Sequence, residues 1–380
     1  MQSAPDVPAP ARTALRRGVL CAAVVAALAV PPVASATGQT GQRKPAAAMA
    51  APPVAAPCAP KELPTLGGSQ GTALAVSTSG LVTGFADDGS GTPQPVLWDA
   101  GTAQRISTGL TNVSPTGVNA RGEVVGVGVD PSSLDQVGWQ WRAGKLTRLR
   151  TLAGTVALPA AISDTGRIVG ALASDDDGAA NPTSGEAPER AASWASAAAM
   201  PSILPALPGD VGAQAYGVNS KGVAVGSSQA SDHFTPVAWD NGGKVAELPA
   251  LGGAWGIARA IDDTGTVVGS AVAATGDPQA VTWDVGRHPT NHGKAGGRHT
   301  QGTGTVHGRA VGTTDVRGGD GVDRPQAVLF GTGTSTSTMP PLAGDPGAGV
   351  TAADDSSGVA VGFSSGSSAS RKPMTWTCAP

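Results

Sequence analysis

The chain has few aromatic and few charged side chains. Its 380 residues include four Phe, one Tyr and eight Trp, and charged residues make up 14 %, roughly half of the usual share. This scarcity of charge excludes coiled coils and charged tails. A net charge of -3 argues against a nucleic-acid-binding protein.

Glycine and proline, in contrast, are abundant. The chain has 55 Gly and 31 Pro, and its apolar share of 40 % consists mainly of Ala and Val. This composition excludes collagen and leaves two interpretations, a low-complexity secreted segment or a turn-rich β protein with glycines at set positions. Periodicity separates them, because only the second predicts glycines in register.

A glycine-bounded pattern, Gly-x-[Val/Ile/Ala]-[Val/Thr]-Gly, recurs along the chain. Successive closing glycines lie 42 to 56 residues apart, and a Trp or Phe follows each copy. Self-similarity at such a period is the signature of a repeat protein, so low complexity is excluded. The copies span 80–84, 122–126, 166–170, 222–226, 265–269, 308–312 and 358–362, and the aromatic residues are Trp98, Trp141, Trp194, Trp239, Trp283, Phe330 and Trp376.

Each copy predicts a β-hairpin. A Ser, Asn or Asp side chain bonds the backbone amides of the turn, and the glycine three residues later takes the positive φ that closes it. The second strand follows as Val-Val-Gly, where the glycine permits close approach of another backbone. The polar turn positions are Ser77, Asn119, Ser163, Asn219, Asp262, Asp355 and, in the degenerate sixth copy, Thr305.

Two further segments complete the repeat. Pro-x-x-Trp-Asp, at 95–99 and 236–240, predicts a third strand, and Leu-Pro-x-Leu-Gly-Gly, at 63–68 and 248–253, predicts a fourth. Four short antiparallel strands match one propeller blade. We therefore expect an all-β, seven-bladed β-propeller over 58–380, with a β-solenoid or sandwich as the alternative. The expected repeats are approximately 61–101, 102–145, 146–200, 201–244, 245–289, 290–333 and 334–380.

These segments resemble a known family of repeats. Residues 248–286, which join Leu-Pro-x-Leu-Gly-Gly, Ile-Asp-x-x-Gly and Val-Val-Gly, are similar to the bacterial HAF extracellular repeat. The resemblance covers about residues 61–380. It departs in repeats 2 and 6, which lack the Leu-Gly-Gly segment, and at Phe330, which replaces Trp. It implies an extracellular location and a repeat architecture, and the family lends no established activity.

The N-terminus predicts export. Arg12, Arg16 and Arg17 precede a short apolar run, and small residues follow before a cleavage site after Ala36. This order is typical of a secretory signal peptide, here residues 1–36. Arg16-Arg17 also resembles a twin-arginine signal, so the predicted route is Sec or Tat.

Residues 37–57 are rich in Ala and Pro and predict a flexible tether, either a cell-wall spacer or an unselected linker. The apolar run of the signal peptide is too short to span a bilayer, and no other segment could do so. We therefore expect a secreted or cell-wall-associated protein.

Two cysteines, Cys58 and Cys378, bracket the repeats. The first repeat begins at a fourth-strand segment, Lys61 to Leu66, whereas the last ends just after the third-strand Trp376. The last blade therefore lacks a strand that the N-terminus can supply, and this pairing closes the ring and covers both sheet edges. In an exported protein we expect a Cys58–Cys378 disulfide beside it, with free thiols or pairing between chains as the alternative.

Successive turns of a four-stranded meander alternate between its two ends. The regular Ser/Asn/Asp-x-x-Gly and Asp-x-Gly turns therefore share one face, and the longer connections share the other. Loops of variable length carry most binding sites, so we expect the site on that variable face, where residues 174–190 form an insert. The candidate binding residues are Trp255, which lies off the repeat position, Arg259, Arg298 and His299.

Two clusters are candidate metal sites. His292, His299 and His307 are candidate Zn²⁺ ligands, and Asp175 to Gly178 with Glu186 are candidate Ca²⁺ ligands. Neither cluster has the spacing of a known site. Polar loops are the competing interpretation, so no cofactor is predicted.

No catalytic residue is assigned, because the chain has no Gly-x-Ser-x-Gly elbow, phosphate loop or dinucleotide fingerprint. We expect a monomeric binding module for an extracellular glycan, peptide or protein, with no nucleic-acid partner. The alternative is an extracellular polysaccharide hydrolase or lyase that uses acidic residues from several blades.

Overall fold

The computed structural model describes residues 58–175, 189–274, 276–331, 335–366 and 370–380. Within these ranges all regular elements are β-strands and none is a helix, which confirms the all-β prediction. It follows that this part of the chain offers no helix long and apolar enough to cross a membrane. The expected signal peptide, the tether and most of the insert at 174–190 lie outside the described residues.

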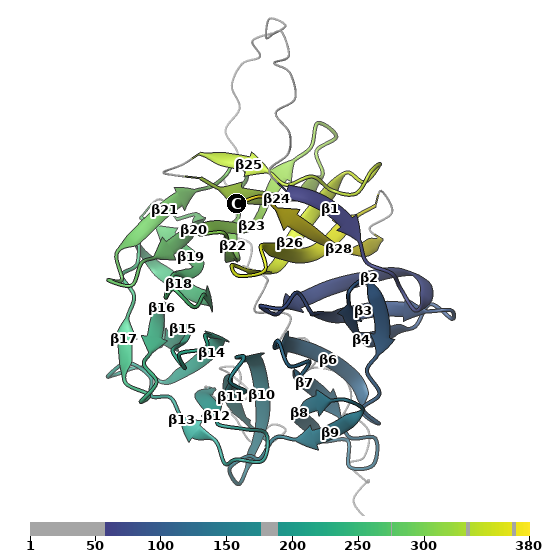
Figure 1. Ribbon diagram of the computed structural model, residues 1–380. Coiled ribbons are helices and arrows are strands. Elements are labelled where there is room, and N and C mark those ends of the chain that lie inside the picture. Colours follow the sequence, from purple (N-terminus) through teal and green to yellow (C-terminus); the bar gives the residue numbers. More distant parts are fainter. Residues whose placement is uncertain (1–57, 176–188, 275, 332–334, 367–369) are drawn as a thin grey trace, which may run out of the picture.

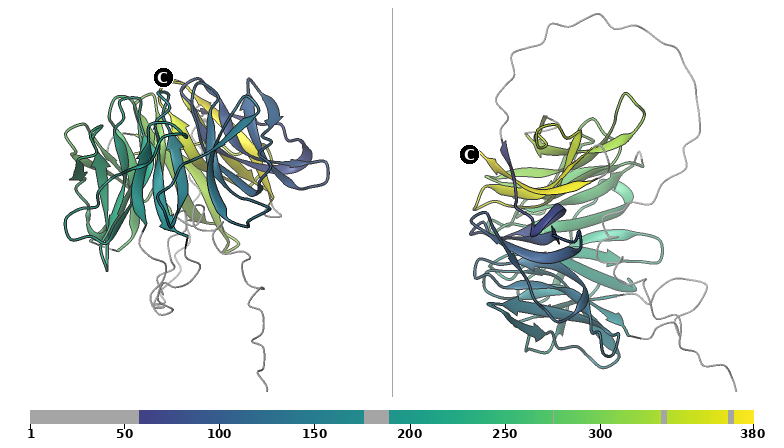
Figure 2. Two further views of the ribbon diagram at one scale, coloured as in Figure 1. Left: turned by 90° about the horizontal axis from the view of Figure 1, so that it is seen from below. Right: turned by 90° about the vertical axis from the view of Figure 1, so that its right-hand side faces the viewer.

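Consecutive strands pair as antiparallel four-stranded meanders arranged around a central axis (Figure 1). The strands run approximately along this axis, so their turns gather on two faces (Figure 2). Each meander begins with an innermost first strand. These first strands are β2 (Gly67–Val76), β6 (Thr111–Val118), β10 (Thr155–Ile162), β14 (Gly212–Val218), β18 (Gly252–Ile261), β22 (Thr300–Val306) and β26 (Gly347–Asp354).

The later strands of each meander lie progressively farther from the axis. The second strands are β3 (Val82–Asp88), β7 (Val124–Val129), β11 (Ile168–Ser174), β15 (Ala224–Gln229), β19 (Val267–Ala273), β23 (Arg309–Arg317) and β27 (Val359–Ser365). The third strands are β4 (Pro93–Asp99), β8 (Gln136–Arg142), β12 (Arg190–Trp194), β16 (Phe234–Trp239), β20 (Pro278–Trp283), β24 (Asp323–Phe330) and β28 (Arg371–Cys378). The outer strands are β5 (Thr102–Arg105), β9 (Lys145–Arg148), β13 (Ser202–Ile203), β17 (Val245–Glu247), β21 (Pro289–Gly293), β25 (Thr336–Thr338) and β1 (Cys58–Glu62).

Two meanders share one sheet. The described strands form five four-stranded sheets and one eight-stranded sheet. In the eight-stranded sheet a single parallel bridge, between Phe234 of β16 and Trp255 of β18, joins the two meanders.

The last meander takes its outer strand from the opposite end of the chain. Strand β1 pairs antiparallel with β28, and Cys58 lies directly opposite Cys378 in this register. The two cysteines form a disulfide across 320 residues of sequence, which confirms the predicted bond. The N-terminal strand begins at Cys58, three residues before the expected segment.

The first turn of every meander except the sixth has the predicted chemistry. In the sixth, Thr305 lies within β22 opposite Ala310 and the turn consists of His307 and Gly308, so the prediction of Thr305 as the polar turn residue is wrong. In the fourth meander the Asn219 side-chain oxygen accepts the backbone N–H of Val223 at 3.0 Å, and Gly222 has a φ of +79°. In the last meander this polar position is Asp354 rather than Asp355, because Asp354 pairs with Val359 and its carboxylate accepts the turn amide of Ser357. The prediction of Asp355 as the turn residue is therefore wrong by one position, since this turn is one residue longer.

The Leu-Pro-x-Leu-Gly-Gly segment is not a fourth strand, and that prediction is wrong. At 248–253 the outer strand β17 ends before Leu248, and the two glycines already belong to β18. The segment crosses between meanders, with Leu248 buried and the Pro249 carbonyl oxygen accepting a 2.9 Å hydrogen bond from the Trp283 indole. Proline has no N–H to offer a sheet, so this segment packs under the next meander instead.

The core lies between neighbouring sheets. The repeated tryptophans are buried there, as predicted; Trp194, for example, packs against Val125 of the preceding meander together with Leu149 and Ile168. Most other core residues are Ala and Val. Small side chains let the sheets stack closely, which explains the low aromatic content.

Candidate functional site

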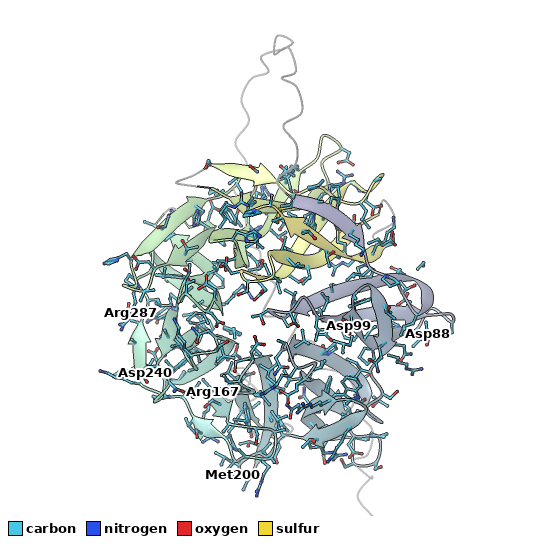
Figure 3. All side chains as sticks on the ribbon, viewed as in Figure 1. Asp88, Asp99, Arg167, Met200, Asp240 and Arg287 are labelled. Atoms are coloured by element: carbon cyan, nitrogen blue, oxygen red, sulfur yellow. A yellow bond between two sulfur atoms is a disulfide. The ribbon has the colours of Figure 1, made fainter. Side chains whose placement is uncertain are left out.

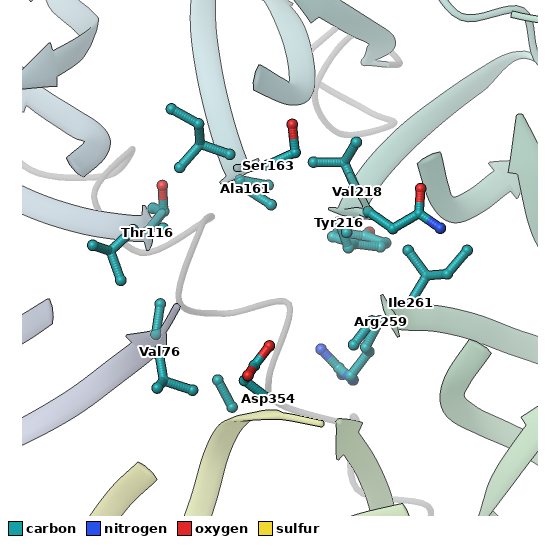
Figure 4. Close-up of a pocket in the computed structure, with 18 of the residues that line it drawn as sticks. Val76, Thr116, Ala161, Ser163, Tyr216, Val218, Arg259, Ile261 and Asp354 are labelled. Atoms are coloured by element: carbon teal, nitrogen blue, oxygen red, sulfur yellow. The ribbon is translucent and has the colours of Figure 1, made fainter. Parts of the chain in front are cut away.

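A cavity of about 370 Å³ lies where the first strands converge on the central axis (Figure 4). Its walls are the ends of these strands and the turns that follow them. It therefore lies at the face of the regular Ser/Asn/Asp-x-x-Gly turns, hereafter the hairpin face, and not at the variable face where we expected a site. A smaller cavity of about 260 Å³ on the variable face lies between β24 and β26 and is lined mainly by apolar residues such as Met339 and Pro341.

Every first strand carries a β-bulge at the same place. One residue is added relative to the second strand, just before the hairpin turn. Bulges re-aim a side chain and are frequent beside functional sites. The added residues, hereafter the bulge residues, are Leu74, Thr116, Ala160, Tyr216, Arg259, Thr303 and Thr351, and all of them line the cavity.

The closing glycine of the sequence repeat explains the bulges. In each meander this glycine lies directly opposite the bulge, for example Gly226 opposite Ala215. A Cβ atom at the seven closing glycines would lie only 1.8–2.2 Å from a carbonyl oxygen of the first strand. No side chain fits there, so the predicted close backbone approach is confirmed. The motif therefore determines where the chain turns one side chain toward the axis.

The bulge residues differ in chemistry around the cavity. Thr116 donates to the carbonyl oxygen of Pro159 in the next meander at 2.8 Å, and Thr351 donates to that of Ala73 at 2.7 Å. These threonines link neighbouring first strands. The two large polar bulge residues, Tyr216 and Arg259, come from the neighbouring strands β14 and β18.

Tyr216 and Arg259 lie in a partly buried polar cluster. The Tyr216 hydroxyl donates to the Gln214 side-chain oxygen, and the Gln214 side-chain nitrogen donates to Glu189. Burial raises the pKa of Tyr216 above its ordinary value of 10.0, and the positive charge of Arg259 opposes that rise. Burial also lowers the pKa of Arg259, yet a guanidinium keeps its proton in a protein. The cavity wall thus holds a fixed positive charge beside a neutral phenol.

Carboxylates surround the hairpin end of the cavity. Asp164 accepts the backbone N–H of Ala120 at 2.7 Å, and Asp263 accepts that of Ser220 at 2.8 Å. Asp355 likewise accepts a backbone N–H from the preceding meander, at 2.6 Å. Each of these aspartates therefore links its own turn to the turn before it.

Asp354 has a different environment at the same end. Burial raises the pKa of its carboxyl group, and the negative charges of Asp164 and Asp355 raise it further, while the bonds from Ser357 oppose the shift. The side chains of Asp354 and Arg259 both point into the cavity (Figure 4). The hairpin end is accordingly negative, and the cluster around Tyr216 contains both the positive charge of Arg259 and the Glu189 carboxylate.

The predicted binding residues lie in three different places. Arg259 lines the cavity. Trp255 is partly buried on the same strand and bridges to Phe234. Arg298 is exposed ahead of β22, and the neighbouring His299 lies 3.9 Å from Asp315. The structure therefore does not bring these residues together.

The candidate metal ligands are also separated. His292 belongs to β21 of the preceding meander, where it is buried 5.3 Å from the Phe330 ring. His307 lies in a hairpin turn and bonds the Cys378 carbonyl oxygen at 3.2 Å. Among the residues that the structure describes, no three His, Cys, Asp or Glu side chains are grouped to hold a metal ion. The Ca²⁺ candidate lies outside these residues except for Asp175.

Sequence reasoning identified Arg259 but missed Tyr216 and the other five bulge residues. A signal was present, because the bulge residue precedes the first glycine of the motif by six residues in five repeats, as Tyr216 precedes Gly222. The motif did not reveal the extra residue, because a bulge can be recognised only when the paired positions of both strands are known.

No family model and no curated protein matches the sequence. Solved structures match the fold. The β-propeller domain of the Trilobed protease from Pyrococcus furiosus is 10 % identical with a TM-score of 0.53, over 81 % of this chain and 95 % of that one. A prolyl endopeptidase is 13 % identical with a TM-score of 0.52, over 80 % of this chain and 47 % of that one. An acylaminoacyl peptidase from Pyrococcus horikoshii is 8 % identical with a TM-score of 0.50, over 79 % of this chain and 50 % of that one.

This chain spans about half the length of the two whole peptidases. At such low identities the likeness concerns the fold alone, which is propeller-like.

Proposed function

We propose that this protein is an exported, seven-bladed β-propeller of the HAF-repeat type, with its ring closed by the β1–β28 pairing. The repeat count in the sequence, the propeller-like neighbours and the Cys58–Cys378 disulfide support this proposal. A disulfide persists in an oxidising compartment, which agrees with the predicted signal peptide.

Its function in this proposal is to bind an extracellular glycan, peptide or protein, and the binding site is the central cavity. One observation carries the proposal: the bulge in every first strand turns one side chain toward the same cavity. A purely structural bulge would be satisfied by small residues at all of these positions. Tyr216 and Arg259 instead place two large polar groups side by side on a rigid scaffold, as ligand sites require.

The enzymatic alternative has less support. Acidic side chains from several blades do meet at the hairpin end, as such an enzyme requires. Asp164, Asp263 and Asp355, however, each accept a backbone N–H of the preceding turn. Carboxylates held in this way stabilise the turns and do not form a free acid–base pair.

The test is a ligand screen with the full chain and with Arg259→Gln. Glycan arrays, peptide pools and extracellular protein extracts are the probes, and hydrolysis products are assayed in parallel. We expect binding that is lost in Arg259→Gln and retained in Arg105→Gln, which changes an exposed arginine on the outer strand β5. Equal binding by both variants would place the site elsewhere, and product formation would favour the enzyme.

A further inference from the structure

The charged groups of the central cavity are unevenly distributed along the axis. Among its described lining residues, Arg259 is the one cation. The acidic lining residues are Asp164, Glu189, Asp262, Asp263, Asp354 and Asp355, and all except Glu189 belong to the hairpin turns. Glu189 belongs to the Tyr216–Gln214 cluster near Arg259. Arg259 is thus the one lining cation that can pair with an anionic group of a ligand, and the carboxylates of the hairpin end can pair with a cationic group.

The positive charge is suited to a carboxylate. A guanidinium presents five N–H donors in a planar fork, so it can hold a ligand carboxylate in addition to a neighbour within the protein. Tyr216 lies on the adjacent strand, and its hydroxyl belongs to the chain of bonds through Gln214. Because the cavity wall is otherwise largely apolar, a charge-assisted pair formed there is stronger than in water.

The distance between the two charged levels sets the length of the ligand. Asp354 lies three residues beyond the bulge residue Thr351 on β26, which is roughly 10 Å along the strand. Arg259 is the bulge residue of its own strand and therefore lies at the level of Thr351. Three extended peptide residues also span about 10 Å.

The cavity walls favour a peptide over a sugar. The side chains between the two charged levels include Val76, Val218 and Ile261, which suit apolar side chains of a ligand. The repeated tryptophans are buried between the sheets, so they offer no platform for stacking a sugar ring. An acidic polysaccharide would also meet the carboxylates at the hairpin end, where repeated like charges repel it.

We infer that the central cavity binds the free carboxyl end of a peptide. The terminal carboxylate pairs with Arg259 beside Tyr216, apolar side chains contact the walls, and an ammonium group about three residues upstream lies beside Asp354. This inference rests on the proposed function of the cavity as the ligand site.

The experiment uses three pools of random tripeptides, one with both ends free, one with amidated carboxyl ends and one with acetylated amino ends. Each pool is equilibrated by dialysis against the full chain, and the retained peptides are quantified by mass spectrometry. We expect the free pool to bind about tenfold or more tightly than the amidated pool, since a hydrogen-bonded charge pair is lost on amidation.

Variants of Arg259 and Asp354 test which residue binds each end of the peptide. Arg259→Gln should abolish the preference for free carboxylates, with Arg105→Gln as the matched control. Asp354→Asn should abolish the preference for free amines and leave the acetylated pool unchanged, with Asp99→Asn, at the exposed end of β4, as its control (Figure 3). Thermal unfolding confirms that each variant folds. If Arg259→Gln does not fold, the comparison with Asp354→Asn still tests whether the amino end of the peptide binds beside Asp354.

Equal binding of the free and amidated pools would overturn carboxylate recognition. If tripeptides do not bind but a glycan or protein binds in an Arg259-dependent manner, the peptide inference fails and the cavity remains the ligand site. If the binding of no ligand class depends on Arg259, both the peptide inference and the proposed function of the cavity fail.

Discussion

Replacing Gly226 by alanine tests whether the close contact of the repeat motif determines the fold and the site. The added Cβ would lie 1.9 Å from the carbonyl oxygen of Gln214 and 2.9 Å from the Cα of Ala215. Both atoms belong to the backbone of β14, so neither can rotate away as a side chain would. The strand must shift at the bulge.

The expected loss of stability is about 1–3 kcal/mol, the usual cost of forcing extra atoms into a packed region. The φ of Gly226 is not positive, so this cost arises from the contact and not from backbone conformation. Gly89→Ala is the matched control. Gly89 also lacks a positive φ, and a Cβ there would have no atom within 4 Å, so alanine should be neutral or stabilise by about 0.4–1 kcal/mol.

The assay is urea unfolding of both variants, together with ligand binding at a temperature where each is folded. Since Gly226 lies opposite the bulge, its replacement should also move Tyr216 and weaken binding beyond the loss expected from partial unfolding. Equal stability of the Gly226→Ala and Gly89→Ala proteins would refute the steric explanation of the motif.

Three further predictions concern the chain ends and the hairpin face. Cys58→Ser should lower stability by up to about 5 kcal/mol in chemical unfolding, because the bond to Cys378 closes most of the chain into one loop; a loss comparable to that of an exposed serine substitution would contradict this. Asp354→Asn should stabilise the protein at neutral pH. The pKa of Asp354 is raised in the folded protein, so the free energy of unfolding of the unchanged protein falls as the pH increases from 3.8 to this raised pKa. At about pH 3 the variant should be no more stable than the unchanged protein. N-terminal sequencing of the exported protein should begin at Thr37, directly after Ala36.

The hairpins and the disulfide could be predicted because their causes are local or topological. Asn219 and Gly222 form their turn through neighbouring amides and one positive φ. The last of the seven repeats lacks a strand that the N-terminus can supply. Cys58 and Cys378 were therefore expected to lie beside each other where this strand pairs. Such features depend on chain order, which the sequence contains directly.

The fourth strand could not be predicted from the same pattern. Leu248 and Pro249 recur as regularly as the strands do, yet Pro249 serves as the acceptor for the Trp283 indole. Recurrence shows that a segment has a fixed role in each repeat. Whether that role is pairing or packing depends on which neighbour reaches it in space.

The composition and spacing of the sequence alone determined an all-β chain of repeated meanders with close-packed glycines. Only the tertiary structure decided that the glycines produce bulges, because a bulge is a mismatch between two paired strands. It likewise decided that Tyr216 and Arg259, 43 residues apart, lie side by side at the axis. Each repeat contributes one side chain there, and the arrangement of the sheets around a common axis brings them together.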